Sequence, residues 1–91
     1  MRIEFDTAKN ERNIRERGLS FESAHEFDFE AAVYVVDNRR NYGEIRFRAL
    51  GYLNKRLHAL VFVAISGGIR VISFRKANRR EVVLYESQTQ T

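Results

Sequence analysis

The sequence contains no cysteine, no proline and no tryptophan. Without cysteine, the chain can form neither disulfide bonds nor thiolate metal sites. No stretch rich in proline, glycine or a repeated residue marks a linker, so the 91 residues are expected to form one domain over residues 1–91. The longest apolar run, Ala59 to Ile65, is far too short to cross a bilayer, and no secretory signal follows Met1. We therefore expect a cytoplasmic protein that makes no membrane contact.

Hydrophobic residues make up 44% of the chain, which includes seven Phe and four Tyr, and this composition is typical of a folded protein. The net charge of +4 conceals an uneven distribution. Residues 1–36 carry five cations and eight anions, whereas residues 37–81 carry eleven cations and three anions. Either the acidic segment folds against the basic one, or the basic part binds a polyanion.

The first third of the chain is expected to be helical after a short extended start. Asp6 is a suitable N-cap for a helix over residues 7–17, and Gly18 can adopt the left-handed conformation that commonly ends a helix. Ser20 begins a second, short helix through FESAHEF. At helical spacing, one side of that helix carries Phe21, Ala24 and either Phe27 or His25.

From Ala31 onward the pattern changes to the alternation and β-branched content of strands. Four strands are predicted, over residues 31–37, 44–53, 56–65 and 69–76. Short links at Asn54-Lys55 and at Ser66-Gly67-Gly68 predict hairpins, and therefore a four-stranded antiparallel meander. Strict alternation in the last strand separates two rows of side chains. One row is Arg70, Ile72, Phe74 and Lys76, and the other is Val71, Ser73 and Arg75.

Asn78, with Glu81 three residues later, resembles a capping box and predicts a C-terminal helix through Tyr85. The predicted fold class is therefore α+β, with N-terminal helices, a four-stranded antiparallel sheet and a C-terminal helix. Helices would cover one face of the sheet. The other face would remain available for a partner.

The segment RVISFRKANRRE, residues 70–81, joins the last strand to the last helix and concentrates cations. Arg79 and Arg80 fall in the first helical turn, where the helix dipole favours anions. A bound phosphate would remove this conflict, and the planar guanidinium fork suits phosphate oxygens. The alternative is a solvated face whose cations pair with Glu81 or with the acidic N-terminal segment.

Three segments resemble the BrnT family of type II toxins, which are ribonucleases with a RelE-like fold. They are KNERNIRERGLSF, DNRRNYGEIRFRALGYL and RVISFRKANRREVVLYE. The resemblance covers nearly the whole chain, and its most specific element is the order and spacing of the last segment. One position departs from the family pattern, because many relatives have His immediately before the glycine that ends the first helix, whereas this chain has Arg17.

The resemblance implies an endoribonuclease that inhibits translation, uses no cofactor and is neutralised by a BrnA-like antitoxin. It also implies a heterotetramer of two toxins and two antitoxins, in which DNA is contacted only through the antitoxin. The substrate would be RNA. A histidine acid or base at position 17 cannot be inferred for this chain.

Metal-independent RNA cleavage needs a base for the 2′-hydroxyl, a cation for the phosphorane and an acid for the leaving 5′-oxygen. Arg75 and Arg79 match the family motif and are the predicted cations. Glu44 and Tyr85 are the predicted catalytic acid or base groups. Basic side chains give affinity through phosphate contacts. The predicted RNA-binding residues are Arg46, Arg48, Arg70, Lys76 and Arg80.

Each acid or base candidate has a structural alternative. Glu44 could serve only in an ion pair with Arg46 or Arg70, and Tyr85 could be a core aromatic. His58 is a further candidate, which could instead be a hydrogen-bonded side chain in a hairpin. Tyr42 and Tyr52 could stack on bases or belong to the core. The acids and histidine of HEFDFE, residues 25–30, are read as solvated side chains rather than as metal ligands.

Two other functions fit the same sequence. The first is a binding module that uses the basic face for nucleic acid or for an antitoxin and performs no chemistry. The second is a toxin with the same fold that acts on a protein target such as gyrase.

Overall fold

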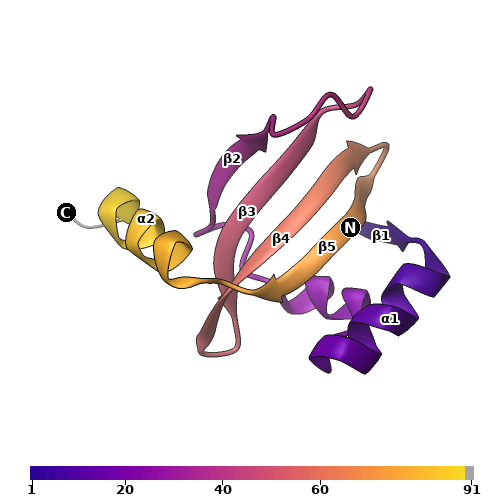
Figure 1. Ribbon diagram of the computed structural model, residues 1–91, viewed down its shortest axis with the longest axis horizontal. Coiled ribbons are helices and arrows are strands. Elements are labelled where there is room, and N and C mark those ends of the chain that lie inside the picture. Colours follow the sequence, from indigo (N-terminus) through magenta and orange to yellow (C-terminus); the bar gives the residue numbers. More distant parts are fainter. Residues whose placement is uncertain (90–91) are drawn as a thin grey trace.

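A computed structural model describes residues 1–89 of the chain. Figure 1 shows the sheet between helices α1 and α2, which lie at opposite ends of the long axis. The elements in chain order are β1 (Arg2–Phe5), α1 (Thr7–Arg17), the 3₁₀ helix η1 (Phe21–Glu26), β2 (Val33–Asp37), β3 (Arg46–Leu53), β4 (Arg56–Ile65), β5 (Gly68–Lys76) and α2 (Arg79–Thr89). Within residues 1–89, no helix is long and apolar enough to cross a membrane.

The sheet has five strands in the order β1-β5-β4-β3-β2. The predicted antiparallel meander is confirmed for β2 to β5, but the prediction of four strands was wrong. The short extended start is a fifth strand, β1, which pairs with β5 in parallel and makes the sheet mixed. Its pairing requires Gly68, because a Cβ there would lie 1.8 Å from the carbonyl oxygen of Arg2. The sequence did not predict β1 as a strand, because its four residues pair with a distant segment and are too few to show a clear alternating pattern.

The predicted helix ends are confirmed by their hydrogen bonds. The Asp6 carboxylate accepts from the Lys9 amide at 3.1 Å, and Gly18 ends α1 with φ of 65°. Ser20 caps η1 by accepting from the Glu22 amide. Phe27, rather than His25, completes the buried side of this short helix.

Strand β5 departs from the strict alternation that the sequence predicts. Val61 pairs with Ser73 and Phe62 pairs with Val71, so Ile72 is an extra residue that forms a β-bulge. The prediction that Val71 and Phe74 lie on opposite sides was therefore wrong, since both belong to the hydrophobic core. The same shift turns Arg70 and Arg75 toward one face.

The two faces of the sheet differ in what covers them. The main core lies between one face and η1, and its buried residues are Phe21, Ala24, Phe27, Ala49, Leu53, Leu60, Phe62, Ile69, Val71 and Phe74. The opposite face carries Arg46, Arg48, Arg70 and Arg75, and we call it the arginine face. Helix α2 packs over one end of the arginine face, where Leu50, Leu57 and Ala59 are buried.

Asn13 is a buried polar residue that joins α1 to the sheet. Its amide nitrogen donates to the carbonyl oxygens of Leu19 and Phe74, each at 2.9 Å. Its amide oxygen accepts from Arg17 at 2.9 Å. Because Phe74 is on β5, this side chain fixes the position of α1 against the sheet.

We expect Asn13→Ala to lower the free energy of unfolding by about 2–3 kcal/mol, because two carbonyl groups lose their donor. Urea denaturation monitored by circular dichroism measures the difference. Asn38→Ala, at an exposed position between β2 and β3, is the matched control and should change stability by less than about 0.5 kcal/mol. Equal effects of the two substitutions would contradict the role of Asn13.

Candidate nucleic-acid interface

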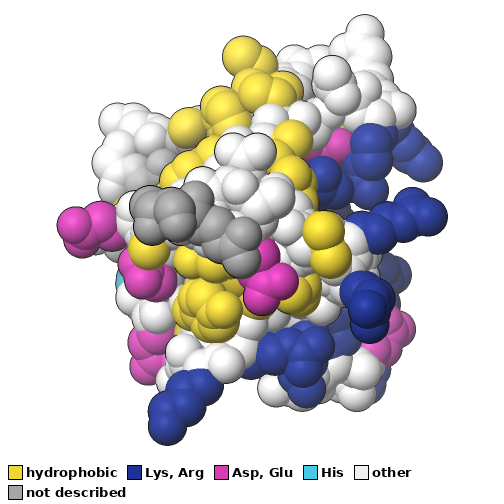
Figure 2. Space-filling model, turned by 90° about the vertical axis from the view of Figure 1, so that its left-hand side faces the viewer, with side chains coloured by type: hydrophobic (Ala, Val, Ile, Leu, Met, Phe, Trp, Pro, Cys, Tyr) yellow, Lys and Arg dark blue, Asp and Glu magenta, His cyan; other side chains and the backbone are white. Residues whose placement is uncertain are grey.

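The strand register aligns the arginine face in successive rows. Arg46 pairs with Asp37, Arg48 lies opposite Val61, Arg75 lies opposite Ala59 and Arg70 lies opposite Val63. Side chains of directly paired residues project from the same face. Four arginines from two strands, β3 and β5, therefore share one surface. Figure 2, in which α2 faces the viewer, shows Lys and Arg side chains gathered along the right-hand side.

The Glu81 carboxylate connects two of these arginines with the start of α2. Arg75 donates to both of its oxygens, at 2.7 and 3.0 Å, and the Arg48 guanidinium lies 3.8 Å away. Glu81 also accepts from the Asn78 amide, while the Asn78 side chain accepts from the Glu81 amide, both at 2.9 Å. The predicted capping box is thus confirmed, and Arg75 is held in an ion pair within the chain.

Glu81 is only 5% exposed, and its environment favours the charged form. Burial opposes ionisation, but the hydrogen bonds from Arg75 and Asn78 and the charges of Arg75 and Arg48 outweigh it, so the pKa of Glu81 is lowered. A carboxylate in the first turn also suits the helix dipole. The unfavourable charge that the sequence indicated at this helix start is therefore offset within the chain.

A second carboxylate, Glu44, lies at the other end of the arginine face. It accepts from Arg70 at 2.7 Å and from Arg46 at 3.2 Å. The Arg46 guanidinium also lies over the Tyr42 ring, 4.0 Å from the ring centroid. The predicted residues Glu44, Arg46 and Arg70 are thus in contact, and the pairing expected as the alternative for Glu44 is present.

Asp37 belongs to the same end of the face, and the sequence alone did not single it out. Arg39 donates to its two oxygens, each at 2.8 Å, and Tyr42 donates at 3.4 Å. The Arg39 hydrogen bonds lower the pKa of Asp37 to about 2, although burial acts in the opposite direction. The only local signal for this interaction is an aspartate followed two residues later by an arginine.

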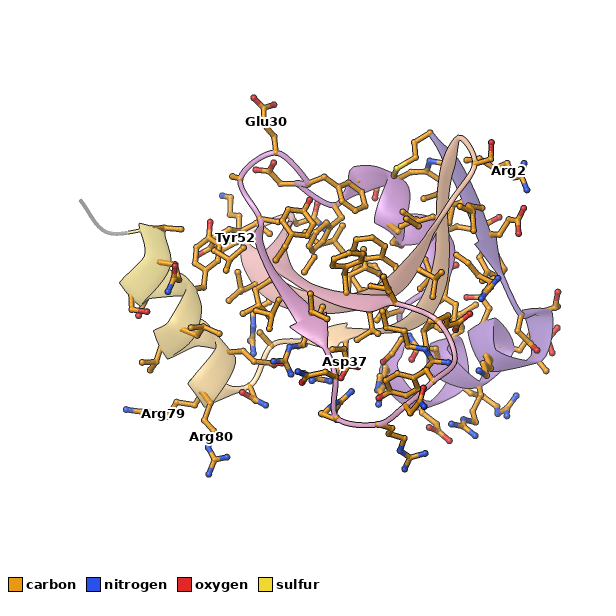
Figure 3. All side chains as sticks on the ribbon, turned by 90° about the horizontal axis from the view of Figure 1, so that it is seen from above. Arg2, Glu30, Asp37, Tyr52, Arg79 and Arg80 are labelled. Carbon is orange, nitrogen blue, oxygen red and sulfur yellow. The ribbon has the colours of Figure 1, made fainter. Side chains whose placement is uncertain are left out.

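The remaining predicted cations occupy other positions. Arg79 and Arg80 are exposed and form no ion pair within residues 1–89. Figure 3 shows both on the first turn of α2, pointing away from the rest of the chain. Lys76 lies opposite His58, on the face of the sheet that η1 covers. The structure therefore does not bring Lys76 together with the arginine face.

Tyr85 and His58 lie away from the arginine contacts. The Tyr85 hydroxyl donates to the Ala31 carbonyl at 3.4 Å, and its ring makes an edge contact with Tyr52 at 5.5 Å. Burial, with Tyr52 and Asp28 nearby, raises the pKa of Tyr85. The His58 ring is 5.6 Å from that of Phe74 in the core, and burial lowers its pKa. His58 is thus a packed side chain on the opposite face.

Arg17 lines a groove of about 220 Å³ between α1 and the bulge of β5. Its guanidinium donates to Asn13, so it supports the buried amide. Within residues 1–89, no group of three or more His, Asp or Glu side chains is arranged to hold a metal ion.

Comparison with protein families identifies the family of the chain, which the geometry alone does not. The model of the ribonuclease toxin BrnT, of type II toxin-antitoxin systems, matches residues 5–81. The chain belongs to the BrnT family. The match includes the arginine face up to Glu81, and BrnT membership implies an antitoxin partner. No curated protein matches the chain.

The ion pairs of Glu81 predict a pH dependence of stability. The pKa of Glu81 is lowered on folding from its ordinary 4.5, so its contribution is complete above about pH 4.5 and is lost as the pH falls through the folded pKa. At pH 7 we expect Glu81→Gln to lower the unfolding free energy by about 1–3 kcal/mol. This difference should narrow as the pH falls below about 4.5.

Denaturant titrations of both proteins over a pH series measure that difference. Glu86→Gln on the same helix, at an exposed position, is the matched control and should cause little change at any pH. If the loss of unfolding free energy in Glu81→Gln stayed constant down to pH 3, the shape of the Glu81 side chain, and not its charge, would account for its role.

Proposed function

We propose that this BrnT-family chain is a metal-independent endoribonuclease that inhibits translation by cleaving RNA on its arginine face. The observation that carries the proposal is the placement of four arginines from two strands, β3 and β5, on one face, with two carboxylates held among them. Such a surface attracts a phosphate chain and supplies cations where negative charge develops.

The scissile phosphate is proposed to sit over Arg48, the middle of the face. Strand residues that share a face are about 7 Å apart, so the rows of Arg75 and of Arg46 lie on either side of Arg48. Arginines from both rows can therefore approach one phosphate from opposite sides.

In the proposed reaction, the 2′-oxygen attacks phosphorus and the bond from phosphorus to the 5′-oxygen breaks. Glu44 accepts the 2′-hydroxyl proton, and Arg75 stabilises the dianionic phosphorane. Arg79, exposed at the start of α2, is proposed to turn toward the same phosphate when RNA binds. Arg75 is the better placed of these cations, because Glu81 holds its guanidinium on the face. The products are a 2′,3′-cyclic phosphate and a 5′-hydroxyl group.

Tyr85 is the proposed proton donor to the 5′-oxygen, a role that requires its hydroxyl to leave the Ala31 carbonyl when RNA binds. Its raised pKa keeps the phenol protonated at neutral pH. It lies four residues after Glu81 in α2, one turn along the same side of the helix. Arg46, Arg48, Arg70 and Arg80 are proposed to hold the RNA backbone, and Lys76 on the opposite face would extend the contact only around the sheet edge.

The antitoxin is proposed to be BrnA-like and to form a heterotetramer of two toxins and two antitoxins. In that assembly the antitoxin would make the DNA contact. No cofactor takes part in the proposed reaction.

A binding module without chemistry is the second candidate function. It is favoured by the ion pairs that already engage Arg75 and Glu44 in the free chain. Such a module would bind RNA with a strong salt dependence and would generate no new RNA ends.

We expect the purified chain to cleave single-stranded RNA in EDTA and to leave 2′,3′-cyclic phosphate ends. Arg75→Ala should lower the cleavage rate by about 100-fold, and Arg79→Ala by about tenfold, because each removes a cation from the transition state. Gel analysis of labelled RNA with characterised ends measures both effects.

Arg15→Ala, which removes an exposed cation from α1, is the matched control and should retain the parent rate. Arg79 is exposed, so its substitution tests the site without disturbing the fold. RNA that is bound but left intact by the parent chain would favour the binding module. Cleavage that is unchanged in both variants would show that the site lies elsewhere.

A further inference from the structure

An open pocket of about 370 Å³ lies beside the segment that connects β2 with β3. Its lining residues are Arg39, Arg40, Tyr42 and Arg46. The volume is at the small end of the range for ligand pockets, about 300–1,000 Å³. Three guanidinium groups around one phenol ring are suited to an anion that also carries a flat ring.

The charges at this pocket are only partly neutralised within the chain. Asp37 binds Arg39, and Glu44 is shared between Arg46 and Arg70. Arg40 is exposed and has no ion-pair partner within residues 1–89. The pocket therefore retains a positive charge at its solvent-facing side.

Tyr42 is held in place on two sides. The Arg46 guanidinium lies 4.0 Å from its ring centroid, and its hydroxyl donates to Asp37 at 3.4 Å. Asp37 is itself fixed, because it is 7% exposed and accepts two hydrogen bonds from Arg39. A fixed stack of guanidinium and aromatic ring is the kind of surface on which nucleobases stack.

The pocket continues the arginine face and is not a separate surface, because Arg46 belongs to both. Along β3, Arg46 is two residues from Arg48, over which the cleaved phosphate is proposed to sit. Two strand residues span roughly 7 Å. That distance corresponds to about two nucleotides of a stacked strand at about 3.4 Å each.

We propose that this pocket binds one nucleotide of single-stranded RNA, about two nucleotides away from the cleaved bond. Its base stacks on the Tyr42–Arg46 pair, and its phosphate contacts Arg40 and Arg39. The inference rests on the proposed function, since it takes RNA along the arginine face as the substrate. It adds an anchoring subsite that fixes which bond of a bound strand reaches Arg48.

The test uses binding, which does not require cleavage. A fluorescent 2′-O-methyl RNA of about ten nucleotides lacks the attacking hydroxyl, and fluorescence anisotropy gives its Kd. The same RNA is then shortened one nucleotide at a time from each end. For the parent chain, affinity should fall sharply when the nucleotide in the pocket is removed.

Tyr42→Leu should weaken binding of the full-length RNA about tenfold. It should also abolish the sharp fall in affinity, because the anchored base no longer has an aromatic ring on which to stack. Tyr42→Phe keeps the ring and should stay within about twofold of the parent. Arg40→Ala should reduce the slope of log Kd against log salt by about 0.7, the loss of one phosphate contact. Arg15→Ala is again the control, and Arg40→Ala tests the pocket independently of any folding defect in Tyr42→Leu.

Parent-like binding by both Tyr42→Leu and Arg40→Ala would overturn the subsite, whether or not the chain cleaves RNA. The expected losses without cleavage of ordinary RNA would support the subsite and reject the proposed nuclease activity. A parent chain that binds no RNA would overturn both.

Discussion

The contact between the Glu81 carboxylate and Arg75 is the interaction on which the rest of the arginine face depends. The same carboxylate caps α2, pairs bidentately with Arg75 and lies near Arg48. Removing one partner of such a partly buried pair leaves an uncompensated charge, which costs more than an exposed ion pair contributes. The position of α2, the orientation of Arg75 and the charge balance at the helix start are therefore coupled through one side chain.

The bulge at Ile72 is the second constraint, and it decides the composition of the face. Without the extra residue, Arg70 and Arg75 would project from opposite sides of β5, because side chains alternate along a regular strand. With it, both lie above the sheet beside Arg46 and Arg48, while Val71 and Phe74 share the core. One inserted residue thus serves the packing of the core and the charge of the surface together.

Cations gathered on one face repel one another, and the chain limits this cost with few carboxylates. Glu81 serves one end of the face, and Glu44 and Asp37 serve the other. In the middle row, the Arg48 guanidinium lies 3.8 Å from Glu81, and its buried Nε atom has no hydrogen-bond partner within residues 1–89. The face therefore keeps more cations than carboxylates.

The sequence by itself determined what short-range interactions control. Asp6, Gly18, Ser20 and the Asn78–Glu81 pair set the helix ends, and alternation with hairpin links set four of the strands, because caps and turns depend on residues close in the chain. The family motif also indicated which arginines to consider. These features were predictable because each one is stabilised within a few residues.

Only the tertiary structure decided the parallel pairing of β1 with β5, the bulge at Ile72 and the partners of each charge. Arg70 lies 26 residues from Glu44 in the chain, and Asn13 lies 61 residues from Phe74. Such contacts depend on how the strands pack, which no local pattern encodes. The sequence thus supplied the cations of the site, whereas strand register decided that Arg70 and Arg75 meet on one face and that Lys76 and His58 lie on the other.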